Sequence, residues 1–391
     1  MSSLGGLLLL LAPAAYAARM VAFRRAWDKL PIPLLPTLPA AVTATSPAET
    51  APRFSVLIAA RNEAENLPQL LYDLAQQTLP TQDFEVIITN DHSTDATATL
   101  LAAAVATSPL QLRIINLADV PGPGLGKKAA LQVALRQARA LWVVCTDADC
   151  RLHPDWLRCY DALLASADPE VRFVSGPVLL TGTDTALDSL SGLEFAGLVS
   201  TGGASIGAGN PTMCNGANLA YRHDAFAAVA GFTGNEHLAS GDDEFLLHKL
   251  HAAFPGSIRF LKHPAAIVRT AGPPTLAALL RQRVRWASKW RHYRHPASQQ
   301  LAVLVLLANV ALAAGLLALL WRLQLVPWVA AAWLLKLGAD VWFLTPVLRF
   351  FGRKHWLWWV PALQIVYAPY ALAVGLAGLR GGYVWKGRPV K

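Results

Sequence analysis

Residues 53 to 146 alternate between apolar, strand-like runs and helix-like segments, and this alternation limits the possible folds more than any other feature. Four short apolar runs predict buried strands, at Phe54–Ala60, Phe84–Thr89, Leu110–Asn116 and Leu141–Thr146. The segments between them predict helices, at 63–77, 96–106 and 127–139. Repeated strand–helix units predict an α/β fold with a mostly parallel sheet that is covered on both faces.

Polar residues follow three of these strands at the point where each strand ends: Arg61-Asn62-Glu63, Asn90-Asp91 and Asp147-Ala148-Asp149. Ligands of such sheets bind at the carboxyl ends of the strands. Two carboxylates at the end of a core strand are costly unless a cation or a partner uses them, and oxygen ligands suit Mg²⁺ or Mn²⁺. A solvated Asp pair in a turn is the alternative for Asp147 and Asp149 alone, but three polar strand ends favour a ligand site.

The loops of this region add further candidates. A carboxylate at Asp91 can accept hydrogen bonds from a base or a ribose, whereas Asp95 favours capping of the next helix. The segment 121–128 fails the P-loop pattern, because position 121 is Pro rather than Gly and position 128 is Lys rather than Ser or Thr. What remains is a turn that brings Lys127 to a helix N-terminus, which favours anions. A surface loop with solvated lysines is the alternative.

Two later segments also carry polar or small residues in informative patterns. The stretch 215–221 follows a Gly-rich region, which permits close backbone approach to a ligand or simply forms a mobile loop. Asp242, Asp243 and Glu244 open a predicted helix. Acids in a first turn suit the helix dipole, but three exceed what capping requires, and one of them fits a general base near a sugar hydroxyl.

A basic and aromatic segment follows, beginning with Gln282-Arg283-Val284-Arg285-Trp286. Trp286 shares a helix face with Trp290 and Tyr293, and cations lie close by. An interfacial helix, anchored by aromatic and basic residues, is the interpretation that we favour for Trp290, Arg291 and Arg294.

Composition indicates membrane segments beside the globular domain. Of the 391 residues, 54% are hydrophobic and only 15% are charged, and the mean hydropathy is +0.36, which is high for a soluble protein. Apolar stretches occur at 4–23, 301–320, 326–348 and 356–379. Lys336 and Asp340 interrupt the third stretch, four residues apart, and can pair on one helix face.

The charge distribution predicts the topology. The net charge is +9, and much of the excess flanks apolar stretches, which fits positive-inside loops better than nucleic-acid binding. Cations follow the first stretch rather than precede it, which favours an uncleaved anchor over a signal peptide cleaved near Ala15-Tyr16-Ala17. The cationic loop 349–355 should be cytoplasmic. Three full spans after residue 300 would place the C-terminal cations outside, so either the rule is broken there or one segment is re-entrant.

The four cysteines form no C-x-x-C pair. Their spacing argues against a zinc site and a disulfide framework, which fits a reducing compartment.

Together these residues resemble the family 2 glycosyltransferases, which are inverting enzymes with a GT-A (Rossmann-like) fold. The resemblance runs from Phe54 to Trp286. Its landmarks occur in order at Ala60–Glu63, Asp91, Gly126-Lys127, Asp147–Asp149, Asp242-Asp243 and Gln282-x-x-Arg285-Trp286. The last motif is shared with membrane synthases of cellulose, hyaluronan and poly-N-acetylglucosamine, and a variant of it occurs in ceramide glucosyltransferases.

The resemblance implies a role for each matching residue. Glu63 and Asp91 should contact the nucleotide. Asp147 and Asp149 should hold the diphosphate through Mg²⁺ or Mn²⁺, with Asp149 favoured as the direct ligand. Asp243 should be the general base, although Asp242 stands where the family has Glu, and Glu244 follows.

The remaining implied roles concern the leaving group and the acceptor. Lys127 and Arg285 should stabilise the leaving diphosphate. Gln282, Arg285 and Trp286 should bind the diphosphate and the acceptor end of the site.

The expected organisation is therefore a transmembrane anchor (1–25), a Pro-rich linker (26–52), a GT-A domain (53–275), an interfacial segment (276–297), about three transmembrane helices (298–380) and a basic tail (381–391). The expected function is transfer of a sugar from a nucleotide sugar, expected to be a UDP-sugar, to a lipid or a growing glycan, with formation of a β-glycosidic bond. We expect a multi-pass protein of the inner membrane with a cytoplasmic catalytic domain and no nucleic-acid partner.

Three alternatives stay open from the sequence. Within the same class, processive polysaccharide synthesis competes with single transfer to a lipid. A phosphatase of the haloacid dehalogenase type would also use Asp147 in an Asp-x-Asp motif, but Arg151 departs from its usual continuation. A membrane protein that binds a cyclic nucleotide or a lipid at a decayed site is the non-enzymatic alternative.

Overall fold

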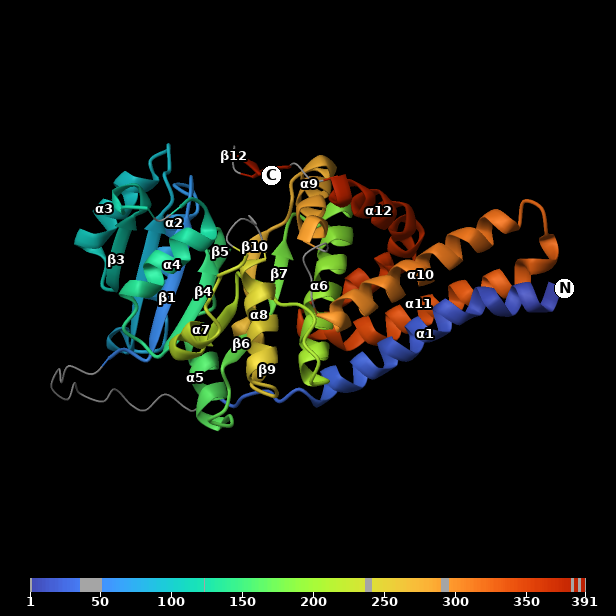
Figure 1. Cartoon of the computed structure of the whole chain (residues 1–391), viewed down its shortest axis with the longest axis horizontal. Helices are drawn as coiled ribbons and strands as arrows, with labels where there is room; N and C mark the ends of the chain where they lie inside the picture. The colour runs from blue at the N-terminus through green and yellow to red at the C-terminus, as the bar shows by residue number, and fades with distance from the viewer. Residues whose placement is uncertain are drawn as a thin grey trace. The chain divides into compact units, whose positions relative to one another are not determined.

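The chain folds into two compact units, each assembled from separate stretches of sequence. Unit 1 comprises Met1–Leu30, Leu180–Met213 and Gly272–Lys391, and unit 2 comprises Pro31–Leu179 and Cys214–Ala271. The computed structural model describes residues 2–35, 51–122, 124–235, 241–289, 295–380, 383–385 and 388–390. Most of the predicted linker, and Trp290, Arg291, Tyr293 and Arg294, lie outside these residues. Figure 1 labels the helices and strands of both units.

Unit 2 is built on a seven-stranded sheet with the order β3-β2-β1-β4-β8-β6-β9. Its strands are β1 (Phe54–Ala60), β2 (Phe84–Asn90), β3 (Gln111–Asn116), β4 (Trp142–Asp147), β6 (Phe173–Ser175), β8 (Leu219–Arg222) and β9 (Ile258–Phe260). Strand β1 runs parallel to β2 and β4, and β2 runs parallel to β3, whereas β8 is antiparallel to β4 and β6. This mixed α/β sheet confirms the predicted fold class, and each of the four predicted strands lies within one residue of its predicted bounds.

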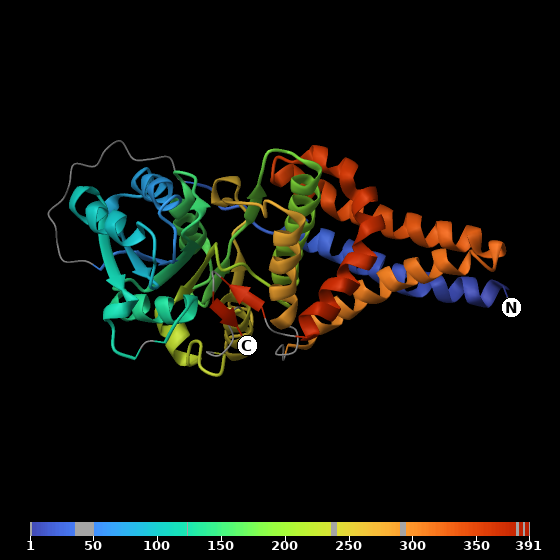
Figure 2. The ribbon, with the colours of Figure 1, turned by 90° about the horizontal axis from the view of Figure 1, so that it is seen from above.

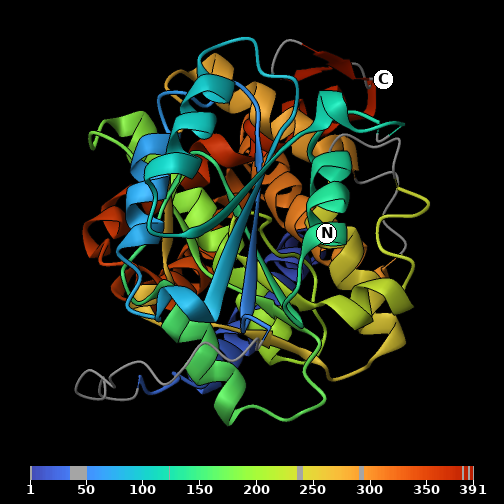
Figure 3. The same ribbon diagram turned by 90° about the vertical axis from the view of Figure 1, so that its left-hand side faces the viewer.

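Helices cover both faces of this sheet, with α2 and α3 on one side and α4 on the other (Figure 3). The helices of unit 2 are α2 (Leu67–Ala75), α3 (Thr97–Thr107), α4 (Lys127–Gln137), α5 (Trp156–Ser166), α7 (His223–Ala228) and α8 (Asp242–Ala253). Short strands β5 (Cys150–Arg151) and β10 (Val268–Ala271) pair antiparallel. Strand β7 (Val178–Thr181) crosses the boundary between the two units in sequence.

The predicted start of the first helix was wrong. Helix α2 begins at Leu67 rather than at Glu63, and Pro68 occupies its first turn, where proline is tolerated. The backbone N–H of Glu63 instead donates to Thr97 Oγ1 at 2.9 Å. A contact with a distant residue therefore overrides the local helical pattern at residues 63–66.

Unit 1 consists mainly of helices. They are α1 (Ser2–Lys29), α6 (Ala186–Gly207), α9 (Leu276–Ala287), α10 (Pro296–Ala318), α11 (Val326–Phe350) and α12 (Val360–Arg380), followed by a hairpin of β11 (Tyr383–Trp385) and β12 (Arg388–Val390). Within the described residues, four helical stretches are long and apolar enough to cross a membrane: Gly5–Lys29, Pro296–Ala318, Leu323–Phe350 and Lys354–Gly378. One N-terminal and three C-terminal apolar helices were predicted, and this count is confirmed.

Helices α1 and α11 run side by side in the same direction. Tyr16 Oη donates to Asp340 Oδ1 at 2.5 Å, and further along the pair the rings of Trp27 and Phe350 meet edge to face at 5.5 Å. Lys336 Nζ donates to Asp340 Oδ2 at 2.8 Å, which confirms the predicted pair on α11. Charged groups inside an apolar bundle need such partners, so this contact fixes α1 against α11.

Helix α6 lies across the C-terminal ends of α1 and α11. A side chain at Gly207 would meet Leu30 at 3.0 Å, and one at Gly197 would meet Leu344 at 3.5 Å. At Gly192 a Cβ would lie 2.4 Å from the Trp356 ring, so the absence of a side chain permits this close approach. Figures 1 and 2 show that α1, α10 and α11 extend away from this layer toward the N-terminus, whereas α12 stays beside α9.

Candidate active site

The loops that follow β1 and β2 are joined by hydrogen bonds between their polar residues. The backbone N–H of Asn62 donates to Ser93 Oγ at 2.9 Å, and that of Thr94 donates to Asn62 Oδ1 at 2.8 Å. Arg61 Nη1 donates to the carbonyl oxygens of Asp91 and His92 at 2.8 and 3.0 Å. Asn62 and His92 adopt left-handed backbone conformations, with φ of 53° and 54°. Such conformations are costly for residues other than glycine and cluster at functional sites.

The two residues predicted to contact the nucleotide lie in these joined loops. Asp91 is buried, and its Oδ1 lies 3.0 Å from His92 Nδ1. Glu63 is also buried, and its Oε2 accepts a hydrogen bond from Asn66 Nδ2 at 2.6 Å. Asp95 accepts from the backbone N–H groups of Thr97 and Ala64, at 3.0 and 3.2 Å, which agrees with its predicted local role at the start of α3.

Lys127 and three predicted acids come together at a second place in unit 2. Lys127 is the first residue of α4, and its Nζ lies 2.5 Å from Asp147 Oδ1 and 3.6 Å from Asp242 Oδ2. A Cβ at Gly216 would lie 3.0 Å from that Nζ and 3.5 Å from Asp243 Oδ2. The end of β4, the start of α4, the start of α8 and the loop before β8 therefore converge on one polar centre.

The acids keep the ammonium group of Lys127 charged. Burial opposes the charge, but the carboxylates of Asp147 and Asp242 outweigh it and hold the pKa of Lys127 well above its ordinary value. The neighbouring thiol of Cys145 behaves in the opposite way, because burial raises its pKa to about 12. The centre therefore offers a fixed ammonium group at neutral pH, whereas the Cys145 thiol stays protonated.

The three acids that open α8 have different surroundings. Asp243 Oδ2 accepts a hydrogen bond from the backbone N–H of Gly216 at 2.8 Å, and its Oδ1 accepts one from the backbone N–H of Glu244 at 2.8 Å. Asp242 instead faces Lys127. The Glu244 contact lies within the first turn of α8, whose cap residue is Gly241. The Gly216 contact ties Asp243 to the small-residue loop. Gly216 lies in the stretch predicted to allow close backbone approach.

The Asp147–Asp149 pair suits a divalent cation that arrives with a phosphate ligand. Among the described residues, no group of three or more His, Cys, Asp or Glu side chains could hold a metal ion. Mg²⁺ is commonly held by one or two carboxylates together with substrate phosphates, so two acids are enough for such an ion. The turn that carries Asp149 is braced by Arg151, whose Nε and Nη2 donate to Asp73 at 2.6 and 2.9 Å.

Gln282, Arg285 and Trp286 lie together on α9 of unit 1. Thr275 caps this helix by accepting from the backbone N–H of Ala278 at 3.1 Å. Arg283 lies between the predicted residues, and its guanidinium carbon is 4.3 Å from the centroid of the Trp286 ring. The structure brings these three residues together on one helix, and their joint action with the acids of unit 2 stays a prediction.

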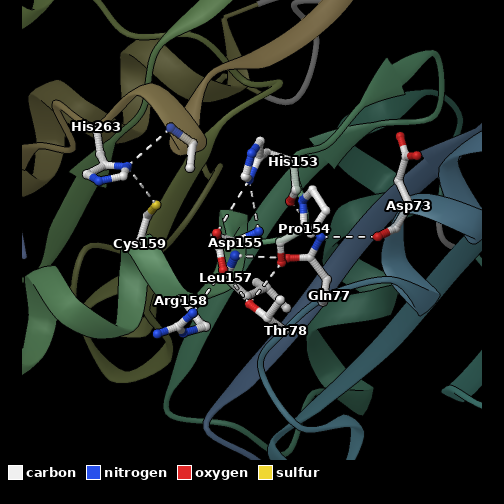
Figure 4. A network of polar contacts seen from close by, with 11 residues as sticks. Asp73, Gln77, Thr78, His153, Pro154, Asp155, Leu157, Arg158, Cys159 and His263 are labelled. Atoms are coloured by element: carbon white, nitrogen blue, oxygen red, sulfur yellow. Dashed lines mark hydrogen bonds and ion pairs between the residues drawn. The ribbon is translucent and has the colours of Figure 1, made fainter. Parts of the chain in front are cut away.

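A cysteine–histidine contact elsewhere in unit 2 is structural rather than catalytic (Figure 4). Cys159 Sγ lies 3.3 Å from His263 Nδ1, but the backbone N–H of Ala265 donates to the same nitrogen at 3.1 Å. That nitrogen is therefore an acceptor, and the thiol donates to it. Burial raises the pKa of Cys159 to about 12, so the thiol is not activated. Beside it, Leu157 N donates to Gln77 Oε1 at 3.0 Å and holds the start of α5.

The sheet, the joined loops and the acid–lysine centre agree with the expected GT-A fold. Residues 55–229 match the family model described as Glycosyl transferase family 2. The matched segment therefore resembles a family 2 glycosyltransferase domain, which favours this interpretation over the phosphatase and non-enzymatic alternatives.

Curated relatives and a solved structure resemble the chain. It is 27% identical over 232 residues to the poly-beta-1,6-N-acetyl-D-glucosamine synthase of Staphylococcus aureus (strain COL), covering 59% of this chain and 53% of the relative. It is 26% identical over 234 residues to the synthase of that name from Staphylococcus epidermidis, covering 60% and 53%. The chain therefore spans about half the length of the curated relatives it matches. The mannosyltransferase PcManGT from Pyrobaculum calidifontis, solved with GDP-Man and Mn²⁺, shares the fold, with a TM-score of 0.52, 21% identity and coverage of 95% of this chain and 99% of that one.

Proposed function

We propose that the protein is a membrane-bound, inverting glycosyltransferase that transfers a sugar from a nucleotide sugar to a lipid or a growing glycan, with formation of a β-glycosidic bond. The observation that carries the proposal is the convergence of Lys127, Asp147, Asp242 and Asp243 in a family 2 domain. We propose a UDP-sugar as the donor, which the named product of the synthase relatives supports.

Asp243 is the proposed general base. An acceptor hydroxyl is a poor nucleophile at neutral pH, so its proton must be removed as it attacks the anomeric carbon. The two backbone hydrogen bonds at Asp243 fix the direction of its carboxylate. A single displacement on the face opposite the nucleotide inverts an α-linked donor to a β-linked product.

The remaining groups bind the donor and stabilise the leaving diphosphate. Lys127 presents a permanent positive charge at the acid centre, and Arg285 supplies a second one in this proposal. Asp147 and Asp149 would hold Mg²⁺ or Mn²⁺, which neutralises charge on the diphosphate when it is bound. Glu63 and Asp91 contact the nucleotide, whereas Gln282 and Trp286 bind the diphosphate and the acceptor end.

The proposed location is the inner membrane, with the catalytic unit on the cytoplasmic side. Cations follow α1 and lie in the loop after α11, as the positive-inside rule requires for this orientation. Processive synthesis is the second candidate, because the curated relatives are polysaccharide synthases by name. Product size after incubation with a labelled donor separates the two, since single transfer gives one discrete glycolipid and a synthase gives a polymer ladder.

The proposal is tested by a donor screen with the full chain in detergent and Mn²⁺, followed by mass spectrometry of lipid and glycan products. Asp243→Asn should lower kcat at least about 100-fold, because the general base is lost while the size of the side chain is kept. The matched control is Asp224→Asn, an exposed carboxylate paired with Arg222 in unit 2. Absence of transfer from every nucleotide sugar, or full activity of Asp243→Asn, contradicts the proposal.

A further inference from the structure

Helix α9, which carries the predicted diphosphate and acceptor residues, is held against α6 by a buried ion pair. Arg283 Nε and Nη2 both donate to Glu194 Oε2, at 3.0 and 2.9 Å. The side chains of Arg283 and Glu194 are only 4% and 8% exposed. Removing one partner of such a pair leaves an uncompensated buried charge. Separating the two side chains is therefore energetically costly.

The second carboxylate oxygen of Glu194 is also engaged. Tyr370 Oη of α12 donates to Glu194 Oε1 at 3.0 Å. One carboxylate on α6 therefore binds side chains from both α9 and α12, and its rotation is restricted from two sides. These contacts could not be predicted from the sequence, because Glu194 lies 89 residues from Arg283 and 176 residues from Tyr370.

Arg283 connects this carboxylate to two of the predicted site residues. Its Nη1 donates to Gln282 Oε1 at 2.7 Å, and its guanidinium carbon lies 4.3 Å from the centroid of the Trp286 ring. Phe195, next to Glu194, approaches the same ring with a centroid distance of 5.8 Å. A planar guanidinium can form directed hydrogen bonds and stack on an aromatic face at the same time, which lysine cannot do.

We propose that Glu194 is a positioning residue: through Arg283 it fixes the side chain of Gln282 and the ring of Trp286. This inference rests on the proposed function, in which Gln282 and Trp286 bind the diphosphate and the acceptor end. Glu194 touches no substrate in this scheme. Its loss therefore weakens acceptor binding and leaves the chemistry at Asp243 in place.

The kinetic test compares Glu194→Gln with the wild-type chain in detergent. The acceptor KM should rise about tenfold, while the rate of donor hydrolysis without acceptor should change less than about threefold. Arg283→Lys should have the same effect, because it keeps the charge but loses the stacking plane. Tyr370→Phe should shift the acceptor KM in the same direction by a smaller factor. Glu170→Gln is the matched control, since Glu170 pairs with Arg172 at an exposed position.

A readout without turnover separates this inference from the proposed function. The chain is labelled with fluorotryptophan, and the fluorine NMR signal of Trp286 is assigned by its loss in Trp286→Phe. Glu194→Gln and Arg283→Lys should move this signal, and Glu170→Gln should not. Folded Glu194→Gln protein with an unchanged Trp286 signal and an unchanged acceptor KM overturns the inference. A shifted signal in a chain that transfers no sugar supports the positioning role and overturns the proposed function alone.

Discussion

Lys127 is the residue at which the proposed catalytic groups of unit 2 meet. Its ammonium contacts Asp147, which ends β4, and Asp242, which opens α8. A lysine ammonium can donate hydrogen bonds to two carboxylates and also to a diphosphate, because all of these groups present anionic oxygen acceptors. The place of the Lys127 ammonium also explains why residue 216 is a glycine, since a Cβ there would lie 3.0 Å from Lys127 Nζ.

Gly216→Ala should therefore disturb donor binding without unfolding the protein. Gly216 does not have a positive φ, so alanine fits the backbone, and the N–H that donates to Asp243 is kept. The added methyl group displaces the Lys127 ammonium, and the donor KM should rise about fivefold or more, with a change in stability below about 1 kcal/mol. Steady-state kinetics and thermal unfolding measure the two effects.

The control for this variant is Gly338→Ala. A Cβ at Gly338 would meet nothing within 4 Å, and alanine is the better helix former. A donor KM for Gly216→Ala equal to that of this control would show that the loop does not approach the donor.

Individual residues differ in how far the sequence could predict them. Lys127, Asp147, Asp242 and Asp243 could be predicted, because a buried strand or a helix start fixes the place of each. The hydrogen bond from Gly216 to Asp243 could only be suspected from the small residues around position 216. The Glu194–Arg283 pair could not be found, because each residue alone resembles an ordinary surface charge in the sequence.

At the scale of elements, strands were easier to predict than helix ends. Strand β2 is buried along its whole length, so its composition alone identifies it. The start of α2 depends on Thr97, which lies 34 residues away and binds the backbone of Glu63. Local propensity cannot include such a partner, so the predicted helix began too early.

The contact between α1 and α11 depends on a hydrogen-bonded polar cluster of Tyr16, Lys336 and Asp340. Lys336→Met leaves the Asp340 carboxylate buried with only Tyr16, and the loss of stability should be on the order of 3 kcal/mol. The variant should therefore unfold at a lower temperature in detergent than the wild-type chain.

The double variant Lys336→Met with Asp340→Leu is the matched control for this prediction. Replacing a whole buried pair by apolar residues is often neutral, so it should recover most of the loss. A double variant as unstable as Lys336→Met would show that Lys336 acts through packing rather than through the charge of Asp340.

At the scale of the whole molecule, the transferase segment and the apolar helices are not separable modules. The family match covers residues 55–229, yet Leu180–Met213 within it belongs to unit 1. Glu194 lies in that stretch, and its partners Arg283 and Tyr370 lie in the part of the chain beyond the match. The segment that the family model recognises therefore includes a helix that folds with the apolar part of the chain.

The same contacts bear on the topology that the sequence left open. In the segment that leads into α12, Trp356 packs against Gly192 on α6. In the middle of α12, Tyr370 donates a hydrogen bond to Glu194 on α6. Near the end of α12, Gly378 lies close to Ala287 on α9. Since α6 lies at the C-terminal ends of α1 and α11, we predict that α12 enters the membrane and returns to the side on which it began. The C-terminal cations would then obey the positive-inside rule.

Accessibility of single cysteines tests this topology. In a chain whose four native cysteines are replaced by alanine, Gln324→Cys lies between α10 and α11, Lys354→Cys lies after α11, and a third cysteine is appended after Lys391. With a membrane-impermeant maleimide, Gln324→Cys should react only from the outer side of the membrane. Lys354→Cys and the appended cysteine should react only from the inner side. An appended cysteine that reacts from the same side as Gln324→Cys would mean that α12 crosses the membrane completely.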